Sequence, residues 1–171
     1  MINLKGKNIV LFGNAKSVFN KERDVDNRFD IICRINVGFP QGKEQYLGSR
    51  TDILFLSLEL SENEIKQFDS QFVIVCSPKI FMTYYMDYRY NLDDWNRLYL
   101  KLGARPSTGL MAFDYLLQLK FKTLTLIGFD FWKTPNWYTD NIHLGQHNPQ
   151  AEKEYIENKI KKYNGKIILE K

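Results

Sequence analysis

The sequence has little cysteine, no long apolar run and no strong excess of charge of either sign. Its two cysteines, Cys33 and Cys76, lie in apolar stretches and have neither a C-x-x-C partner nor a Cys/His spacing. We therefore expect buried free thiols and no zinc site. The apolar runs are far shorter than the ~20 residues of a membrane span. We expect neither a transmembrane helix nor a signal peptide.

The charge balance argues against a nucleic-acid partner. Lys and Arg total 24 against 20 Asp and Glu, a formal charge of +4, and no tract of five or more basic residues occurs. With 44% hydrophobic and 26% charged residues, a chain of this length buries a sizeable core without cross-links. We expect one domain, residues 1–171, in the cytoplasm, with peripheral contact with a membrane left open.

Short β-branched runs alternate with helical patterns along the chain. The runs predict strands at residues 8–12, 29–36, 53–58, 72–76, 123–127 and 166–169. Apolar spacings of three and four residues predict helices at 61–68, 92–102 and 149–163, and one more after Thr108. This alternation is typical of an α/β fold with a mostly parallel, doubly wound sheet.

Residues 105–132 organise the chain, because they predict a loop, a helix, a strand and a second loop. Ser107 and Thr108 are suitable N-cap residues, and the following strand ends at Gly128. Ligands of open α/β sheets bind beyond the carboxyl ends of the strands, where helix N-termini offer free N–H groups. A phosphate-bearing ligand with Arg105 as a fixed cation is one hypothesis, and an ordinary capped helix is the other.

Two further strands end in polar residues. Gly13 and Asn14 follow the first strand, where glycine lets the backbone approach a ligand and the amide both donates and accepts hydrogen bonds. Arg34 and Asn36 share one side of the second strand. Buried there, they require either polar partners in the protein or a ligand.

Two carboxylates and two histidines lie outside the predicted elements. Asp24 and Asp26 have the spacing of an Asp-x-Asp metal site, but they precede a strand instead of ending one, so we discount them as solvated. Residues 132–148 have no periodicity and predict a short lid. They contain both histidines of the chain, His143 and His147, and imidazole is the natural proton acceptor near neutral pH.

These segments, in this order, resemble the motifs of the sialyltransferases of glycosyltransferase family 29. The large sialyl motif is matched by three segments: Val10–Asn14, Asp30–Asn36 and Gly48–Asp52. The small motif is matched by Pro106–Gly109 and Gly128–Phe129, and the very short C-terminal motif by His147 and Glu152. Bacterial family 42 is resembled nearly as closely, through Tyr46–Gly48, Arg105, Tyr138 and the paired histidines.

The resemblance implies a single Rossmann-like, GT-A-like glycosyltransferase domain with a lid at about 132–148. Such a protein is an inverting enzyme that moves sialic acid from CMP-sialic acid to a hydroxyl of an oligosaccharide or lipid-linked glycan. It needs neither a metal nor another cofactor.

The resemblance also implies a role for each matched residue. His147 would be the general base, with His143 as its competitor, while Arg105 and Tyr138 would stabilise the leaving phosphate. The donor nucleotide would be held by residues of three loops: Gly13, Asn14, Asn36, Ser107, Thr108 and Gly109.

The chain departs from both families at matched positions. Ile9 and Phe121 stand where animal family 29 enzymes have the cysteines of a disulfide, which agrees with a reducing compartment. Trp132 replaces a phosphate-contacting Tyr, Ser57 replaces a donor-binding Asn, and the lid is shorter. Two alternatives stay open: a transferase for another CMP-activated ulosonic acid, such as a Kdo-like sugar, and a non-catalytic module that binds CMP or a glycan.

Overall fold

The computed structural model describes residues 2–80, 85–139, 142 and 144–170. Its sheet has seven strands in the order β5-β4-β3-β2-β1-β6-β7, all paired in parallel. The strands are β1 (Asn8–Phe12), β2 (Ile31–Ile35), β3 (Ile53–Leu56), β4 (Phe72–Val75), β5 (Tyr88–Arg89), β6 (Thr123–Ile127) and β7 (Ile167–Glu170). The helices are the 3₁₀ helix η1 (Lys16–Asn20), α1 (Val25–Arg28), α2 (Glu44–Leu47), α3 (Glu62–Gln67), α4 (Leu92–Leu102), α5 (Thr108–Leu117) and α6 (Pro149–Lys162).

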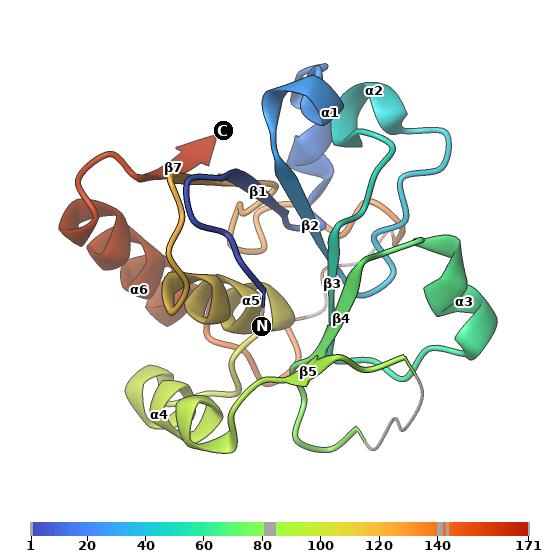
Figure 1. Ribbon diagram of the computed structural model, residues 1–171. Helices are drawn as coiled ribbons and strands as arrows, with labels where there is room; N and C mark the ends of the chain where they lie inside the picture. Colours follow the sequence, from blue (N-terminus) through green and yellow to red (C-terminus); the bar gives the residue numbers. More distant parts are fainter. Residues whose placement is uncertain (1, 81–84, 140–141, 143, 171) are drawn as a thin grey trace.

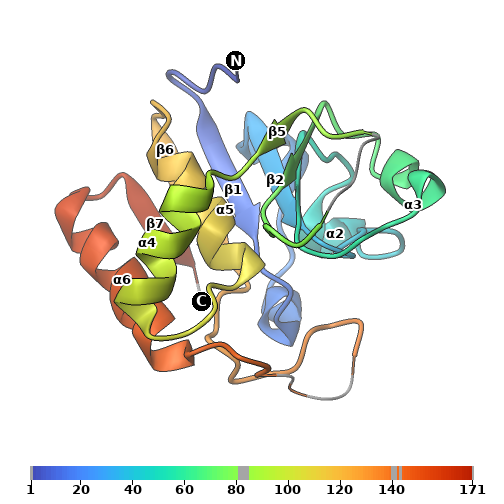
Figure 2. The same ribbon diagram turned by 90° about the horizontal axis from the view of Figure 1, so that it is seen from below.

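The sheet confirms the predicted α/β, doubly wound fold. The chain winds outward from β1 through β5 and then returns to the other side of β1 with β6 and β7. Helices α4, α5 and α6 cover one face, and η1, α1, α2 and α3 cover the other (Figures 1 and 2). The short elements α1, α2 and β5 were not predicted, because two to four residues carry too little periodicity.

Successive strand residues alternate between two apolar layers. Ile9 and Leu11 of β1 pack with α5 and α6, whereas Val10 and Phe12 pack with η1, α1 and α2. Because both faces are covered, the central strands are apolar at nearly every position. The larger layer also contains both cysteines, which are buried free thiols as predicted.

The segments that leave β1 and β6 touch through their backbones. The Gly13 N–H donates to the carbonyl of Ile127 at 2.7 Å. A Cβ on Gly13 would lie 2.3 Å from the Gly128 carbonyl oxygen, and Gly128 itself has a φ of +76°. Residues with side chains rarely adopt that conformation. Both glycines are therefore required by the contact between the two segments, before any ligand is considered.

The buried Arg34 finds its polar partners within the protein. It is 1% exposed, and its Nη2 donates to the carbonyl oxygens of Leu47, Gly48 and Arg50 at 2.7 to 3.0 Å. The guanidinium thus holds the connection from α2 to β3 against the sheet. Its Nε donates to Thr51 Oγ1 at 3.0 Å, whereas its Nη1 is buried and has no hydrogen-bond partner among the described residues.

The Asp24 and Asp26 carboxylates also serve the protein itself. Asp26 accepts hydrogen bonds from the Ser49 N–H at 2.7 Å and the Arg50 N–H at 3.2 Å, and Asp24 accepts one from Asn27 at 2.9 Å. These bonds lie beside the segments that enter β2 and β3.

No helix among the described residues is long and apolar enough to cross a membrane. The single-domain organisation and the cytoplasmic location stay predictions.

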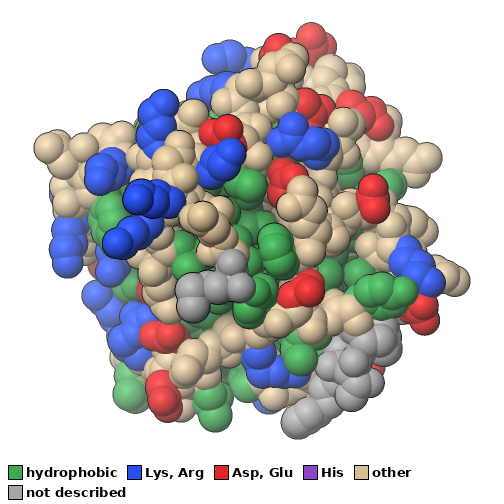
Figure 3. All heavy atoms as spheres, in the orientation of Figure 1, with side chains coloured by type: hydrophobic (Ala, Val, Ile, Leu, Met, Phe, Trp, Pro, Cys, Tyr) green, Lys and Arg blue, Asp and Glu red, His purple; other side chains and the backbone are tan. Residues whose placement is uncertain are grey.

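The face on which the chain begins has a mixed surface. Lys and Arg side chains gather on the side of α6 and β7, and acidic side chains are interspersed over the rest of this face (Figure 3). Side chains of both signs are therefore present on this face (Figure 3).

Gly128→Ala should destabilise the protein far more than Gly6→Ala. Both glycines have a φ of +76°, but a Cβ on Gly6 meets nothing within 4 Å, whereas one on Gly128 would lie 2.4 Å from Val18 Cγ1. Gly6→Ala therefore isolates the backbone cost of about 1–2 kcal/mol, and Gly128→Ala adds about 1–3 kcal/mol of overpacking. Urea unfolding of both variants measures the two losses. Equal losses would contradict the close contact between the segments.

Candidate active site

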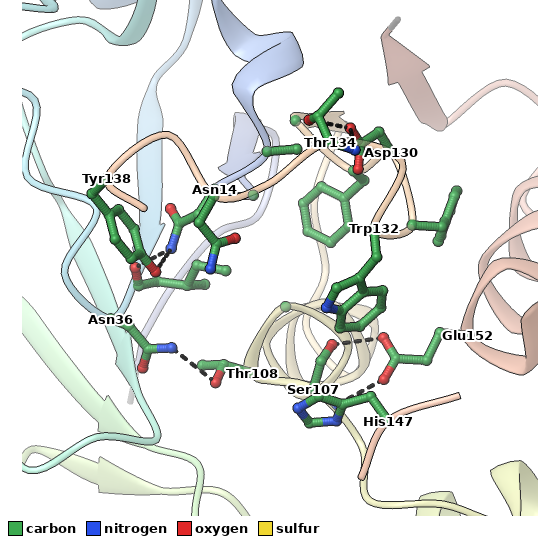
Figure 4. Close-up of a pocket in the computed structure, with 18 residues that line it drawn as sticks. Asn14, Asn36, Ser107, Thr108, Asp130, Trp132, Thr134, Tyr138, His147 and Glu152 are labelled. Atoms are coloured by element: carbon green, nitrogen blue, oxygen red, sulfur yellow. Dashed lines mark hydrogen bonds between the residues drawn. The ribbon is translucent and has the colours of Figure 1, made fainter. Parts of the chain in front are cut away.

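A pocket opens at the carboxyl ends of β1, β2 and β6, with the N-terminus of α5 in its wall (Figure 4). The strand order reverses between β1 and β6, and open α/β sheets bind ligands at such a point. Segments far apart in the sequence meet here. The predicted site residues that line the pocket are Gly13, Asn14, Asn36, Ser107, Thr108, Gly109, Tyr138 and His147.

Arg105 and His143 are the two predicted site residues that this set does not contain. Arg105 is not among the residues that line the pocket, although its backbone ties the start of α5 to the loop before α6. Its N–H donates to the Gln146 carbonyl at 3.1 Å, and its own carbonyl oxygen lies 2.7 Å from His147 Nδ1. His143 lies outside the described residues, so its role stays a prediction.

Asn14 connects the end of β1 to the loop before α6. Its Nδ2 donates to the Ile35 carbonyl at 3.2 Å and to the phenol oxygen of Tyr138 at 3.1 Å. Because the phenol oxygen accepts from Asn14, its own hydrogen is available for another acceptor. Burial raises the pKa of Tyr138, so the phenol is a protonated donor at neutral pH.

Asn36 joins the end of β2 to two other elements. Its φ is +50°, a left-handed conformation that Asn adopts more readily than most residues. Its Nδ2 donates to Thr108 Oγ1 at 3.1 Å, and its Oδ1 accepts from the Ser57 N–H at 2.9 Å. Both ends of the amide are therefore used by the protein. A ligand would share the Asn36 side chain with Thr108 and Ser57.

Ser107 is the N-cap of α5, as predicted, and it is bound by a buried carboxyl. Its Oγ accepts from the Leu110 N–H at 3.1 Å and donates to Glu152 Oε2 at 2.6 Å, while its N–H donates to Glu152 Oε1 at 2.8 Å. Glu152 is 3% exposed and lies in the first turn of α6. Burial raises the pKa of Glu152 to about 7, although the bonds from Ser107 act to lower it.

His147 is oriented as a proton acceptor. Its Nδ1 lies 2.7 Å from the Arg105 carbonyl oxygen, which can only accept a hydrogen bond. In the neutral ring Nδ1 therefore carries the hydrogen, and Nε2 keeps the lone pair. Burial lowers the pKa of His147, so the neutral form prevails at pH 7. The ring packs against Trp132, with 5.4 Å between the centroids.

The loop after β6 holds two bulky residues in a rare backbone conformation. Phe131 has a φ of +59° and Trp132 a φ of +61°, and both line the pocket. Such strain persists only where surrounding contacts impose it, and it is typical of functional sites. Asp130 anchors the loop, because it accepts from the Thr134 N–H at 3.0 Å and the Thr134 hydroxyl at 2.5 Å.

Several lining residues were not predicted as site residues: Phe129, Asp130, Phe131, Trp132, Thr134, Asn136 and Glu152. The end of a buried strand at Gly128 indicated that the following segment lies on the rim. Only the folded chain shows which side chains face inward.

Within the part of the chain that the structure describes, no group of three or more His, Cys, Asp or Glu could hold a metal ion.

The fold of this chain is similar to the solved structures of several sialyltransferases. A mammalian sialyltransferase in complex with Gal-beta-1-3GalNAc-ortho-nitrophenol has a TM-score of 0.69 and 16% identity, covering 97% of this chain and 70% of its own. CstII from Campylobacter jejuni, in complex with the substrate analogue CMP-3FNeuAc, has a TM-score of 0.67 and 17% identity over 95% of this chain and 81% of its own. The monofunctional alpha-2,3-sialyltransferase Cst-I from Campylobacter jejuni has a TM-score of 0.70 and 14% identity over 99% and 78%.

No protein-family model matches the chain, and no curated protein matches its sequence. At identities of 14 to 17% the structural likeness establishes a shared fold. It agrees with the α/β architecture of the parallel sheet. What the site does is argued from its own chemistry.

Glu152→Gln should make the protein more stable relative to the parent as the pH rises. The folded chain keeps a proton that the unfolded chain, with an ordinary pKa of 4.5, releases between pH 4.5 and about 7. The contribution of Glu152 to stability is therefore present below pH 4.5 and is lost as the pH rises through about 7. Gln avoids this loss and keeps a donor and an acceptor for Ser107.

Between pH 5 and pH 8 the difference in the free energy of unfolding should shift by about 2–3 kcal/mol in favour of the variant. Urea unfolding at both pH values measures it, with Glu154→Gln as the control, because Glu154 is exposed on the same helix. If the difference in the free energy of unfolding between Glu152→Gln and the parent did not change with pH, burial would not destabilise the ionised form of Glu152.

Proposed function

We propose that the chain is an inverting glycosyltransferase that moves sialic acid from CMP-sialic acid to a hydroxyl of a glycan, related to families 29 and 42. The observation that carries this proposal is the orientation of His147 in the switch-point pocket. Its Nδ1 is engaged by a backbone carbonyl, and its neutral Nε2 is left to accept a proton. The sialyltransferase fold of the solved neighbours supports it.

The nucleotide phosphate is proposed to bind at the N-terminus of α5. Thr108 and Gly109 occupy the first turn, where backbone N–H groups have no partner within the helix and the helix dipole favours an anion. The protonated phenol of Tyr138, bound by Asn14, supplies a second donor. These groups would stabilise the charge that develops on the phosphate as it leaves.

The acceptor hydroxyl is proposed to attack the anomeric carbon from the side opposite the phosphate. The new glycosidic bond forms as the bond to the phosphate oxygen breaks, so the configuration inverts and CMP leaves with the bonding electrons. His147 Nε2 takes the hydroxyl proton. Trp132, packed on the His147 ring, keeps the imidazole in place for this transfer.

A second candidate donor is another CMP-activated ulosonic acid, such as a Kdo-like sugar. The observation that favours it is the pocket lining beyond the helix terminus, where Phe131 and Trp132 are held in strained conformations. Both residues border the space that would be left for the sugar. The nucleotide subsite is the same for both donors.

His147→Ala should reduce kcat by about 10² to 10⁴-fold, because general-base catalysis contributes that much. Affinity for CMP should stay nearly unchanged, since Nε2 serves the acceptor. The release of CMP from CMP-sialic acid measures turnover, and calorimetry measures CMP affinity. Gln146→Ala is the matched control, because its exposed side chain precedes His147 and only its backbone binds Arg105. Unaltered turnover in His147→Ala would refute the assignment.

Turnover should persist in EDTA, because helix N–H groups and a phenol take the place of a metal ion at the phosphate. The assay compares CMP-sialic acid with CMP-Kdo, each in EDTA and in manganese. Complete loss in EDTA that manganese restores would contradict metal independence. Faster transfer from CMP-Kdo would select the second donor, and CMP binding without transfer from either would support a non-catalytic module.

A further inference from the structure

Glu152 is a buried carboxyl in the wall of the pocket, and the proposed transfer reaction does not yet use it. Both of its oxygens accept hydrogen bonds from Ser107, one from the N–H and one from the hydroxyl. Ser107 caps α5 directly before Thr108 and Gly109. The carboxyl therefore lies one hydrogen bond away from the proposed phosphate subsite.

A phosphate at the start of α5 would meet an unfavourable charge if Glu152 were ionised. Within the described part of the chain, the residues that line the pocket include the carboxylates of Asp130 and Glu152 but neither Lys nor Arg. Two anions repel each other, and the repulsion is stronger where one of them is buried, as Glu152 is. Protonation of the carboxyl removes this repulsion.

We propose that Glu152 takes up a proton when the nucleotide phosphate binds, and that the neutral carboxyl turns the Ser107 hydroxyl toward that phosphate. The inference rests on the proposed binding of a CMP donor at α5. The Oε2–H of neutral Glu152 donates to Ser107 Oγ, and Oε1 still accepts from the Ser107 N–H. Ser107 Oγ still accepts from the Leu110 N–H, and its own hydrogen is released to a phosphate oxygen.

The direction of the Ser107 hydroxyl is the geometric core of this proposal. With an ionised Glu152 the hydroxyl must donate to the carboxylate, as the 2.6 Å contact indicates, and it offers the phosphate only a lone pair. With a neutral Glu152 it becomes a third donor beside the backbone N–H groups of Thr108 and Gly109. Glu152 is thus a positioning residue that acts through Ser107.

Charged and titratable groups surround Glu152 on several segments of the chain. The charged and titratable groups of the surrounding segments are Arg105, Asp130, Tyr138 and His147 and, on its own helix, Lys153 and Tyr155. Burial lowers the pKa of His147 and raises the pKa values of both tyrosines. The second ionisation of a phosphate monoester, near pH 6, is complete at pH 8. Burial holds the pKa of Glu152 at about 7, so it is the group poised to gain a proton there.

Calorimetric titration of CMP at pH 8, in two buffers with different enthalpies of ionisation, counts the protons taken up. The parent should gain most of one proton per CMP, and its affinity should fall roughly tenfold from pH 7 to pH 8.5. Glu152→Gln mimics the neutral carboxyl and should take up none, with an affinity that does not change over this range. Glu154→Gln, exposed on the same helix, should behave as the parent.

Binding of CMP to the parent without proton uptake, or equal uptake by Glu152→Gln, would overturn this inference and leave the proposed function intact. No CMP binding between pH 6 and pH 8.5 would overturn both. If Glu152→Gln does not fold, His147→Ala decides: retained uptake supports Glu152 as the proton acceptor, and lost uptake overturns it. If Glu152 had only a structural role, Glu152→Gln would change the stability of the protein without changing the number of protons taken up per CMP.

Discussion

The backbone contact between Gly13 and Gly128 is the constraint on which the site depends. It holds together the two segments that leave β1 and β6, at the one place where the strand order reverses. Asn14 directly follows Gly13, and the strained loop that contains Trp132 follows Gly128. Since neither glycine tolerates a side chain without a shift of its neighbours, this close approach sets where the two walls of the pocket begin.

The polar side chains of the pocket serve the scaffold and the proposed chemistry at once. Asn14 binds Tyr138, and Asn36 binds Thr108, so each pair joins a strand end to a later element. These bonds orient donors before a ligand arrives, which lowers the reorganisation needed for transfer. Removal of either amide would therefore break a hydrogen bond that joins two segments of the pocket and would also remove a proposed ligand contact. A loss of activity in such variants would have both of these causes.

The electrostatics of the pocket are unusual for the phosphate subsite that we propose, because carboxylates line it and, among its described lining residues, there is neither Lys nor Arg. Attraction for an anion must come from the N-terminus of α5, from phenol and hydroxyl donors, and from protonation. Burial provides the last of these, since it raises the pKa of Glu152 and keeps the pKa of Tyr138 high. Burial also lowers the pKa of His147, which keeps a base available in the same cavity. Burial thus favours the protonated form of Glu152 and the unprotonated form of His147 in the same pocket.

The sequence by itself determined the elements whose signals are local. Apolar runs that end at Gly13 and Gly128, the Ser107 cap and the periodic patterns of α4 and α6 predicted the parallel sheet and several of the pocket residues. Only the tertiary structure decided how they meet, because burial and partners come from distant parts of the chain. Asn14 and Tyr138 are 124 residues apart, and the proton affinity of Glu152 follows from a cavity that exists only after folding. For the same reason only the folded chain shows that Arg105, a predicted phosphate contact, is not among the residues that line the pocket and that its carbonyl oxygen lies 2.7 Å from His147 Nδ1.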